Sequence, residues 1–201
     1  MSRLHTIFVI LATIAAAACG REPLDWACPD VGPGELILTE IRGPQTGSEA
    51  QDWFEFYNAS GQELDLYGAQ FFIRRLDGSN PRTIIVREPG VMVEAGDYFV
   101  LGNAAPGDEP DHVDYGYARD FPVDLYDTAA IDITACGEQI DQVVYRNLPR
   151  EGTLSFDGAR EPSGEANSDA ALWCPDVQLS GDSGLVGTPG APNRECPADD
   201  D

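Results

Sequence analysis

Residues Asp52–Leu66 read DWFEFYNASGQELDL, and this stretch decides the fold. An aromatic run leads into an Asn-Ala-Ser-Gly segment, and a short second run follows. Because side chains alternate across a strand, Phe54 and Phe56 share one face, which we expect to meet the core. Asn58 and Gly61 accept the positive φ angles that tight turns require. The stretch therefore predicts a strand, a turn and a second strand.

The rest of the chain repeats this pattern of short apolar runs separated by Gly, Pro, Asn and Asp. Such punctuation is typical of all-β proteins, and no segment shows sustained helical periodicity. Cys136-Gly137-Glu138 predicts the tip of a hairpin. The expected strands are 35–41, 53–58, 63–66, 69–75, 83–86, 98–102, 130–136, 139–145 and 153–156.

Six segments, taken in order, resemble the bacterial lamin-tail domain. They are 35–41 (ELILTEI), 52–58 (DWFEFYN), 64–68 (LDLYG), 93–102 (VEAGDYFVLG), 140–145 (IDQVVY) and 187–193 (GTPGAPN). The resemblance implies an immunoglobulin-like antiparallel β-sandwich, and it brings no catalytic residues with it. Region 115–133 has no counterpart among the family's strands, so the resemblance does not predict its path.

The first 18 residues have the features of an export signal. Arg3 gives a weakly basic start, Ile7–Ile14 is apolar, and Ala15–Ala18 leads directly to Cys19. The apolar run is shorter than the roughly 20 residues that span a bilayer, and it fits a cleaved signal peptide. A cysteine at this place resembles a bacterial lipobox, so we expect lipidation of Cys19. Gly20 after it indicates outer-membrane sorting, and release by ordinary cleavage is the alternative.

The strong negative charge of the chain limits the kinds of macromolecule that it can bind. The chain has 35 acidic residues, 12 Arg and no Lys, and its formal net charge is −23. Such a surface repels polyphosphates, whereas nucleic-acid binding depends on neutralising phosphates. We therefore expect no nucleic-acid partner, and we expect an envelope or surface protein or a glycan instead.

Besides Cys19 the chain has four cysteines, an even number that in an exported protein favours two disulfides. Three pairings are possible. Because Cys28 and Cys196 bracket the domain while Cys136 and Cys174 lie inside it, we favour the nested pairing Cys28–Cys196 and Cys136–Cys174. A metal site formed by these residues is disfavoured, because no Cys-x-x-Cys motif occurs.

The Gly/Pro-rich loop 104–122 contains the candidate cation site. Asp108, Asp111 and Asp114 supply the hard oxygen atoms that calcium prefers. Their spacing differs from that of an EF-hand, and a solvated acidic loop is the simpler interpretation. Calcium binding is the alternative, and no other cofactor is expected.

The three tryptophans point to carbohydrate binding as an alternative function. We expect Trp26, Trp53 and Trp173 to pack in the core or against disulfides, and an exposed Trp26 would instead form a platform for a sugar.

Two features bear on an enzymatic interpretation. Gly181–Gly184 (GDSG) is similar to the nucleophile motif of serine proteases, but the chemistry of Ser183 would need a His and an Asp. The only histidine after the signal is His112, which lies in the acidic loop. Glu40 and Glu55 lie on strands expected to be neighbours, where two carboxylates can form a cation site or an acid–base pair. We interpret them as solvated residues of an outer sheet face, and we expect no enzyme activity.

These observations predict four segments. They are a signal peptide (1–18), a lipidated cysteine with its tether (19–34), a β-sandwich (35–193) and an acidic tail (194–201). The expected protein is a non-enzymatic cell-envelope lipoprotein, anchored in the outer membrane, or secreted as the alternative. Its sandwich would serve as an interaction or structural module at a membrane surface, and a calcium-dependent adhesive or carbohydrate-binding module is the functional alternative.

Overall fold

The computed structural model describes residues 27–45, 52–180 and 184–198, and in these ranges the chain is built almost entirely of β-strands. One 3₁₀ turn, η1 (Ala170–Leu172), precedes the last strand. None of the helical structure within these ranges is long and apolar enough to cross a membrane. The expected signal peptide and Cys19 lie outside the described residues.

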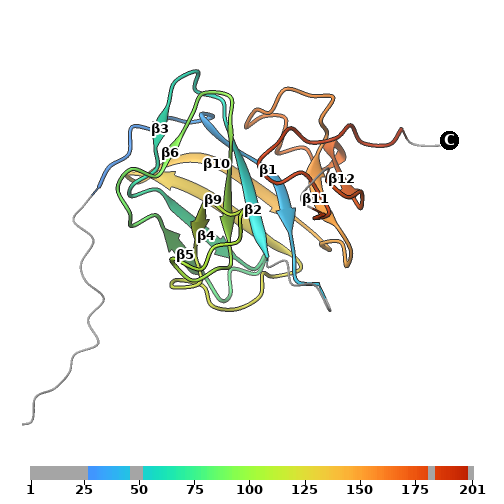
Figure 1. Ribbon diagram of the computed structural model, residues 1–201, viewed down its shortest axis with the longest axis horizontal. Helices are drawn as coiled ribbons and strands as arrows, with labels where there is room; N and C mark the ends of the chain where they lie inside the picture. The colour runs from blue at the N-terminus through green and yellow to red at the C-terminus, as the bar shows by residue number, and fades with distance from the viewer. Residues whose placement is uncertain (1–26, 46–51, 181–183, 199–201) are drawn as a thin grey trace, which may run out of the picture.

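Two sheets form the layers of a β-sandwich (Figure 1). The first sheet has the order β12 (Trp173–Asp176), β11 (Thr153–Phe156), β1 (Leu36–Arg42), β2 (Trp53–Asn58), β7 (Tyr98–Gly102) and β8 (Tyr115–Gly116). The second has the order β10 (Glu138–Tyr145), β9 (Ala129–Ala135), β4 (Gln70–Arg74) and β5 (Arg82–Ile85). A small pair, β3 (Leu64–Asp65) and β6 (Met92–Val93), stands apart from both. Neighbouring strands are antiparallel except β7 and β8, which are parallel.

Aromatic side chains join the two layers. The rings of Phe56 in β2 and Phe71 in β4 lie 4.8 Å apart between their centroids. Phe54 and Phe56 both belong to the main buried cluster, so the face predicted to meet the core is confirmed. Gly61 has the expected positive φ of 74°. Asn58 shapes the turn with its side chain, which donates to the carbonyl of Val93 and accepts the amide of Ser60.

A β-bulge in β1 decides which of its side chains enter the core. Leu38 pairs with Phe56, but the next pair is Glu40 with Glu55, so Thr39 is the extra residue. A bulge shifts the alternation of side chains by one position. Ile41 therefore joins the core, and Glu40 turns to the outer face beside Glu55.

All nine strands expected from the sequence are present, and each end lies within one residue of its predicted position. Three strands were not predicted. β6 and β8 have only two residues each, and β8 lies in the region for which the resemblance offered no counterpart. β12 contains Pro175, which reduces its strand signal but is tolerated because β12 is an edge strand.

The preferred disulfide pairing is wrong. Cys28 bonds to Cys136, with Cα atoms 5.2 Å apart, and Cys174 bonds to Cys196, with Cα atoms 5.8 Å apart. Cys136 does lie at the predicted β9–β10 hairpin tip, with φ of 52°. That tip, however, meets the start of the domain and not the β12 segment. Both ends of the domain are thus fastened to its body rather than to each other.

Removing each disulfide should lower stability to a different extent. The bridges close loops with sequence separations of 108 and 22 residues. In the chain-entropy model their upper-limit contributions are roughly 5 and roughly 3 kcal/mol. We expect the C28S/C136S variant to lose more unfolding free energy than the C174S/C196S variant, as measured by urea denaturation. Non-reducing peptide mapping of the wild type should show the two pairs named above, and a peptide joining Cys28 to Cys196 would contradict the structure.

Candidate functional site

The most unusual feature of the described chain is a pair of buried carboxyl groups. Glu40 and Glu55 are cross-strand partners on β1 and β2, and both side chains are 0% exposed. The interpretation as solvated residues is therefore wrong, although their position on the outer sheet face was expected. They are buried because the segment Gly187–Asn193, called the strap below, lies across this face.

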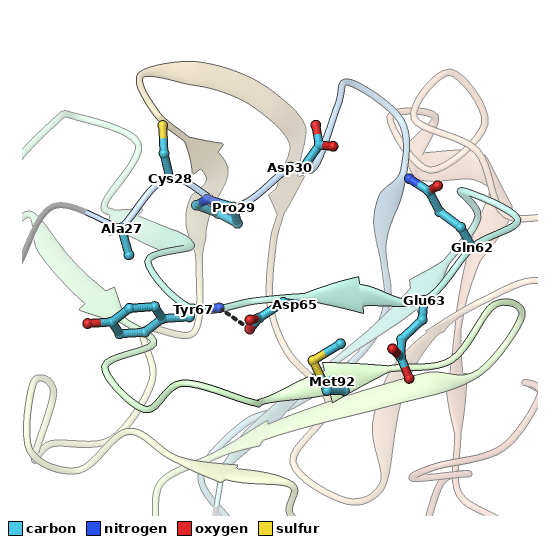
Figure 2. A pocket seen from close by; sticks show the side chains of 9 residues that line it. All are labelled: Ala27, Cys28, Pro29, Asp30, Gln62, Glu63, Asp65, Tyr67 and Met92. Atoms are coloured by element: carbon cyan, nitrogen blue, oxygen red, sulfur yellow. Dashed lines mark hydrogen bonds between the residues drawn. The ribbon is translucent and has the colours of Figure 1, made fainter.

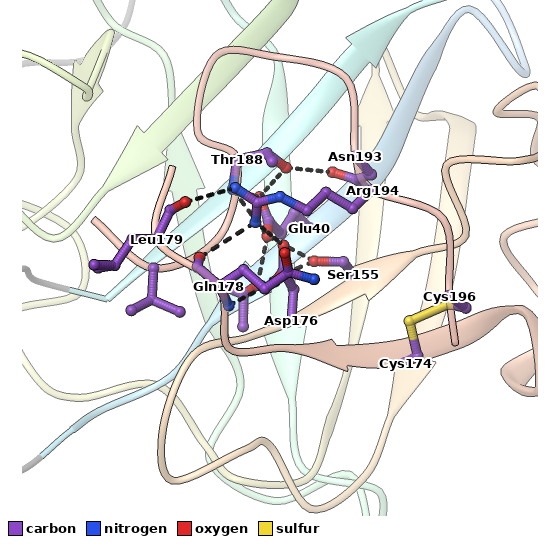
Figure 3. A network of polar contacts seen from close by, with 12 residues as sticks. Glu40, Ser155, Cys174, Asp176, Gln178, Leu179, Thr188, Asn193, Arg194 and Cys196 are labelled. Carbon is purple, nitrogen blue, oxygen red and sulfur yellow. Dashed lines mark hydrogen bonds and ion pairs between the residues drawn. A yellow bond between two sulfur atoms is a disulfide. The ribbon is translucent and has the colours of Figure 1, made fainter. Parts of the chain in front are cut away.

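Glu40 accepts hydrogen bonds from two directions (Figure 3). From β11, the next strand of the sheet, the hydroxyl groups of Thr153 and Ser155 donate to Oε1, with 2.6 Å for Ser155. From the strap, Thr188 donates its amide to Oε2 at 3.1 Å and its hydroxyl to the same oxygen at 3.2 Å. The carboxyl group of Glu40 thus joins the sheet to the strap.

Glu55 has a similar set of donors. The amide of Gly190 in the strap donates to its Oε2 at 2.7 Å, and the amide of Ala191 adds a further hydrogen bond. The hydroxyl of Thr39, the bulge residue, donates to Oε1 at 3.1 Å. Both glutamates are therefore held by the strap and by one strand of the sheet, which is β11 for Glu40 and β1 for Glu55.

Asn193 fixes the end of the strap to the sheet. Its side-chain amide donates to the carbonyl oxygens of Thr39 at 2.8 Å and Phe156 at 2.9 Å. At the other end, Gly187 has φ of 94°, and a Cβ atom there would lie only 2.7 Å from Oε1 of Glu40. Only glycine fits this position. The Gly-Thr-Pro-Gly-x-x-Asn pattern of the strap is thus explained by its contacts with the buried pair.

Contacts on either side of the strap hold it in place. Before it, Leu179 and Val186 form a β-bridge, and Gly187 donates its amide to the carbonyl of Gln178. After it, Arg194 forms an ion pair with Asp176 of β12 and donates to the carbonyls of Gln178 and Leu179 (Figure 3). The Cys174–Cys196 disulfide follows two residues later.

Burial governs the protonation of the pair. Removal from water raises the pKa of Glu55 well above its usual value, and the neighbouring charge of Glu40 raises it further. Burial also raises the pKa of Glu40, but hydrogen bonds from Ser155, Thr153 and Thr188 oppose the rise. Two carboxyl groups this close titrate as one unit. Burial and mutual repulsion therefore both disfavour two neighbouring carboxylates under the strap.

This arrangement makes the pair a fastening rather than an open reactive site. Neither carboxyl group reaches solvent, and the chain's own N–H and O–H groups occupy the oxygen atoms of both. The sequence places the two glutamates on neighbouring strands but does not reveal their partners Thr153, Ser155 and Thr188. The alternating Thr-x-Ser of β11 was the available signal, because two hydroxyl groups then share the face opposite the core.

The other residues singled out from the sequence are not brought together. The carboxylate of Asp114 accepts the amide of Val100 at 2.7 Å and so fastens the loop to β7. Within the described ranges no three His, Cys, Asp or Glu side chains gather to hold a metal ion. Asp108, Asp111 and Asp114 belong to no such group, and calcium binding by this loop stays a prediction.

The protease-like and sugar-binding features are likewise dispersed. Ser183 and Trp26 lie outside the described residues. Trp53 is fully buried, and the indole N–H of Trp173 donates to the carbonyl of Asn167 at 2.8 Å. His112 is half-buried, and burial lowers its pKa. Neither described tryptophan presents an open aromatic platform.

An open groove of about 570 Å³ lies at the other end of the domain, where the described chain begins (Figure 2). Its walls combine the start of the chain with the β3–β6 pair. The lining residues are Ala27, Cys28, Pro29, Asp30, Gln62, Glu63, Asp65, Tyr67 and Met92. Acidic side chains on both walls make this end of the domain repel anions.

Comparisons with known proteins leave the chain without an assigned family. No protein-family model matches it, and no curated protein matches it significantly.

Replacing Asn193 with alanine should loosen the strap. The change removes both donors that bridge Thr39 and Phe156 and leaves two backbone carbonyls without them. We expect a loss of about 1–3 kcal/mol of unfolding free energy, measured by urea denaturation. Asn103→Ala is the matched control, because its side chain makes only a 3.4 Å contact at the surface. Equal stability of the two variants would contradict the role given to Asn193.

Removing divalent cations should leave stability unchanged. A ligand that binds only the folded state stabilises it by RT ln(1 + c/Kd), where c is the free ligand concentration, and so raises the melting temperature. Because the acidic loop shows no gathered carboxylates, we expect the same Tm in calcium and in excess chelator, measured by differential scanning calorimetry. If the Tm is higher in calcium than in chelator, and the Asp111→Asn variant shows no such difference, this loop binds calcium.

Proposed function

We propose that this protein is a lipid-anchored module of the bacterial cell envelope, similar to lamin-tail domains, that acts through binding rather than catalysis. The observation that carries the proposal is the use of its five cysteines. Four of them are joined in two disulfides, a feature of proteins folded outside the cytoplasm. The fifth is Cys19, the residue that follows an apolar, small-residue leader.

The order of the fold supports the lamin-tail likeness. The segments that resemble that family lie on β1, β2, β3, β7 and β10 and in the strap. Several of these segments also contact one another, because β1 and β2 pair while the strap closes over both. Contact between segments that carry the resemblance supports the proposal that they form one unit.

The position of the first disulfide gives the anchored domain an orientation. Seven residues lie between Cys19 and Ala27, and the eight extended steps from one to the other reach at most about 30 Å. Cys28 then fixes the start of the fold to the β9–β10 hairpin tip. The acidic groove at Cys28 would face the membrane, and β11, β12 and the strap would lie at the far end (Figure 1).

This arrangement favours a display role. A lipidated cysteine with several acyl chains anchors a protein firmly. The disulfide-fastened sandwich then holds its far loops at a fixed distance from the membrane, and the strong negative charge keeps it soluble and away from phosphate-rich polymers. The partner class is therefore an envelope or surface protein or glycan.

Lipidation is tested with the full chain expressed in a Gram-negative bacterium. We expect the protein in the membrane fraction, with an intact mass above that of the polypeptide starting at Cys19 by the mass of its acyl groups. The Cys19→Ser variant should lose both properties. Cys28→Ser is the control, because it removes a structural cysteine of the same chain and should keep the anchor. A wild-type protein released without acyl groups would contradict the proposal.

A further inference from the structure

We propose that the strap, Gly187–Asn193, is a proton-operated lid, closed while Glu40 and Glu55 share one proton and opened locally when that proton is lost. This inference is independent of the lipid anchor. It concerns a movement of the domain itself, and it rests on what surrounds the two carboxyl groups.

The hydrogen-bond donors of the closed lid stabilise one negative charge on the pair, but the lid has no cationic group to stabilise a second. Its sequence, GTPGAPN, contains no charged side chain. The lid's polar contacts with the pair are N–H groups and one hydroxyl, which come from Thr188, Gly190 and Ala191. Loss of the shared proton would leave two neighbouring carboxylates in a compartment closed to water, an arrangement that is strongly unfavourable.

The charged and titratable groups around the pair do not remove this repulsion. Asp176 on β12 adds a further negative charge that acts on Glu40, and Arg194 is already paired with Asp176. Arg42 follows Glu40 on β1 and is attracted to it and to Asp52, while burial lowers its own pKa. Tyr98 on β7 stays neutral, because burial and then Glu55 raise its pKa to about 12.

Movement of the lid is the easiest relief of that repulsion. The strands beneath are held by the ladders of the sheet, whereas the lid is not part of any named strand and Gly190, Ala191 and Pro192 are exposed. Segments with few buried contacts open at lower free energy than the core. The Leu179–Val186 bridge and the Cys174–Cys196 disulfide lie outside the lid, so both of its ends stay attached when it opens.

Hydrogen exchange resolved by residue tests this lid. Exchange of an unstructured amide rises about tenfold per pH unit, so the measured rates are divided by those of unstructured peptides to give the opening equilibrium. For Thr188 and Gly190 we expect that equilibrium to rise by up to about tenfold per pH unit between the ordinary carboxyl range, in which the open pair titrates, and the raised pKa of the closed pair, since opening releases one proton in this interval. For core amides such as Phe71 and Ile131 we expect no such rise.

Neutral variants identify the source of the proton. The double variant Glu40→Gln/Glu55→Gln leaves no ionisable carboxyl group under the lid and should abolish the rise at Thr188 and Gly190 while the core stays protected. Burial raises the pKa of each glutamate by itself, so either single variant should keep a rise. Glu165→Gln, a change at an exposed loop position, should keep it. The lid is overturned if the wild-type strap shows no rise, if core amides rise in parallel, or if the rise persists in the double variant.

Discussion

The β-bulge at Thr39 determines the two faces of β1, and most of the remaining structure depends on that strand. Regular alternation would direct Glu40 between the sheets, among the side chains of Leu36 and Leu38. Because one residue is inserted, Ile41 takes the inner position and Glu40 lies beside Glu55 on the outer face. A single extra residue thus separates a continuous apolar core from a buried polar cluster.

Covering that polar cluster would be destabilising if the strap did not also donate hydrogen bonds to it. A buried carboxyl group costs several kcal/mol unless hydrogen bonds replace those it made with water. The strap supplies these bonds with residues suited to each position: Thr188 donates twice, Gly190 donates its amide, and Asn193 spans two strands. The C-terminal motif and the glutamates of β1 and β2 are therefore parts of one interaction, although well over 100 residues separate them in sequence.

Features that depend on local sequence signals could be predicted, whereas features that depend on contacts between distant segments could not. Strands such as Trp53–Asn58 were predicted because alternation and turn residues are local signals. Burial of Glu40 was not, because it requires both the bulge and a distant segment that covers it. The disulfide pairing failed for the same reason. The spacing of Cys136 and Cys174 does not reveal that the hairpin tip meets the start of the domain, whereas the last cysteine meets β12.

Covalent attachment on both sides changes what is required of the strap. A segment with fixed ends loses less conformational freedom on closing than a free tail, because much of its chain entropy is already removed. Fewer hydrogen bonds are then needed to close it than a free tail would require. One pKa unit corresponds to about 1.4 kcal/mol, so the proposed loss of the proton shared by Glu40 and Glu55 would make closing less favourable by up to that amount for each pKa unit by which burial raises the titration of the pair. A long unattached tail would need stronger contacts to close, and one proton would have far less influence over it.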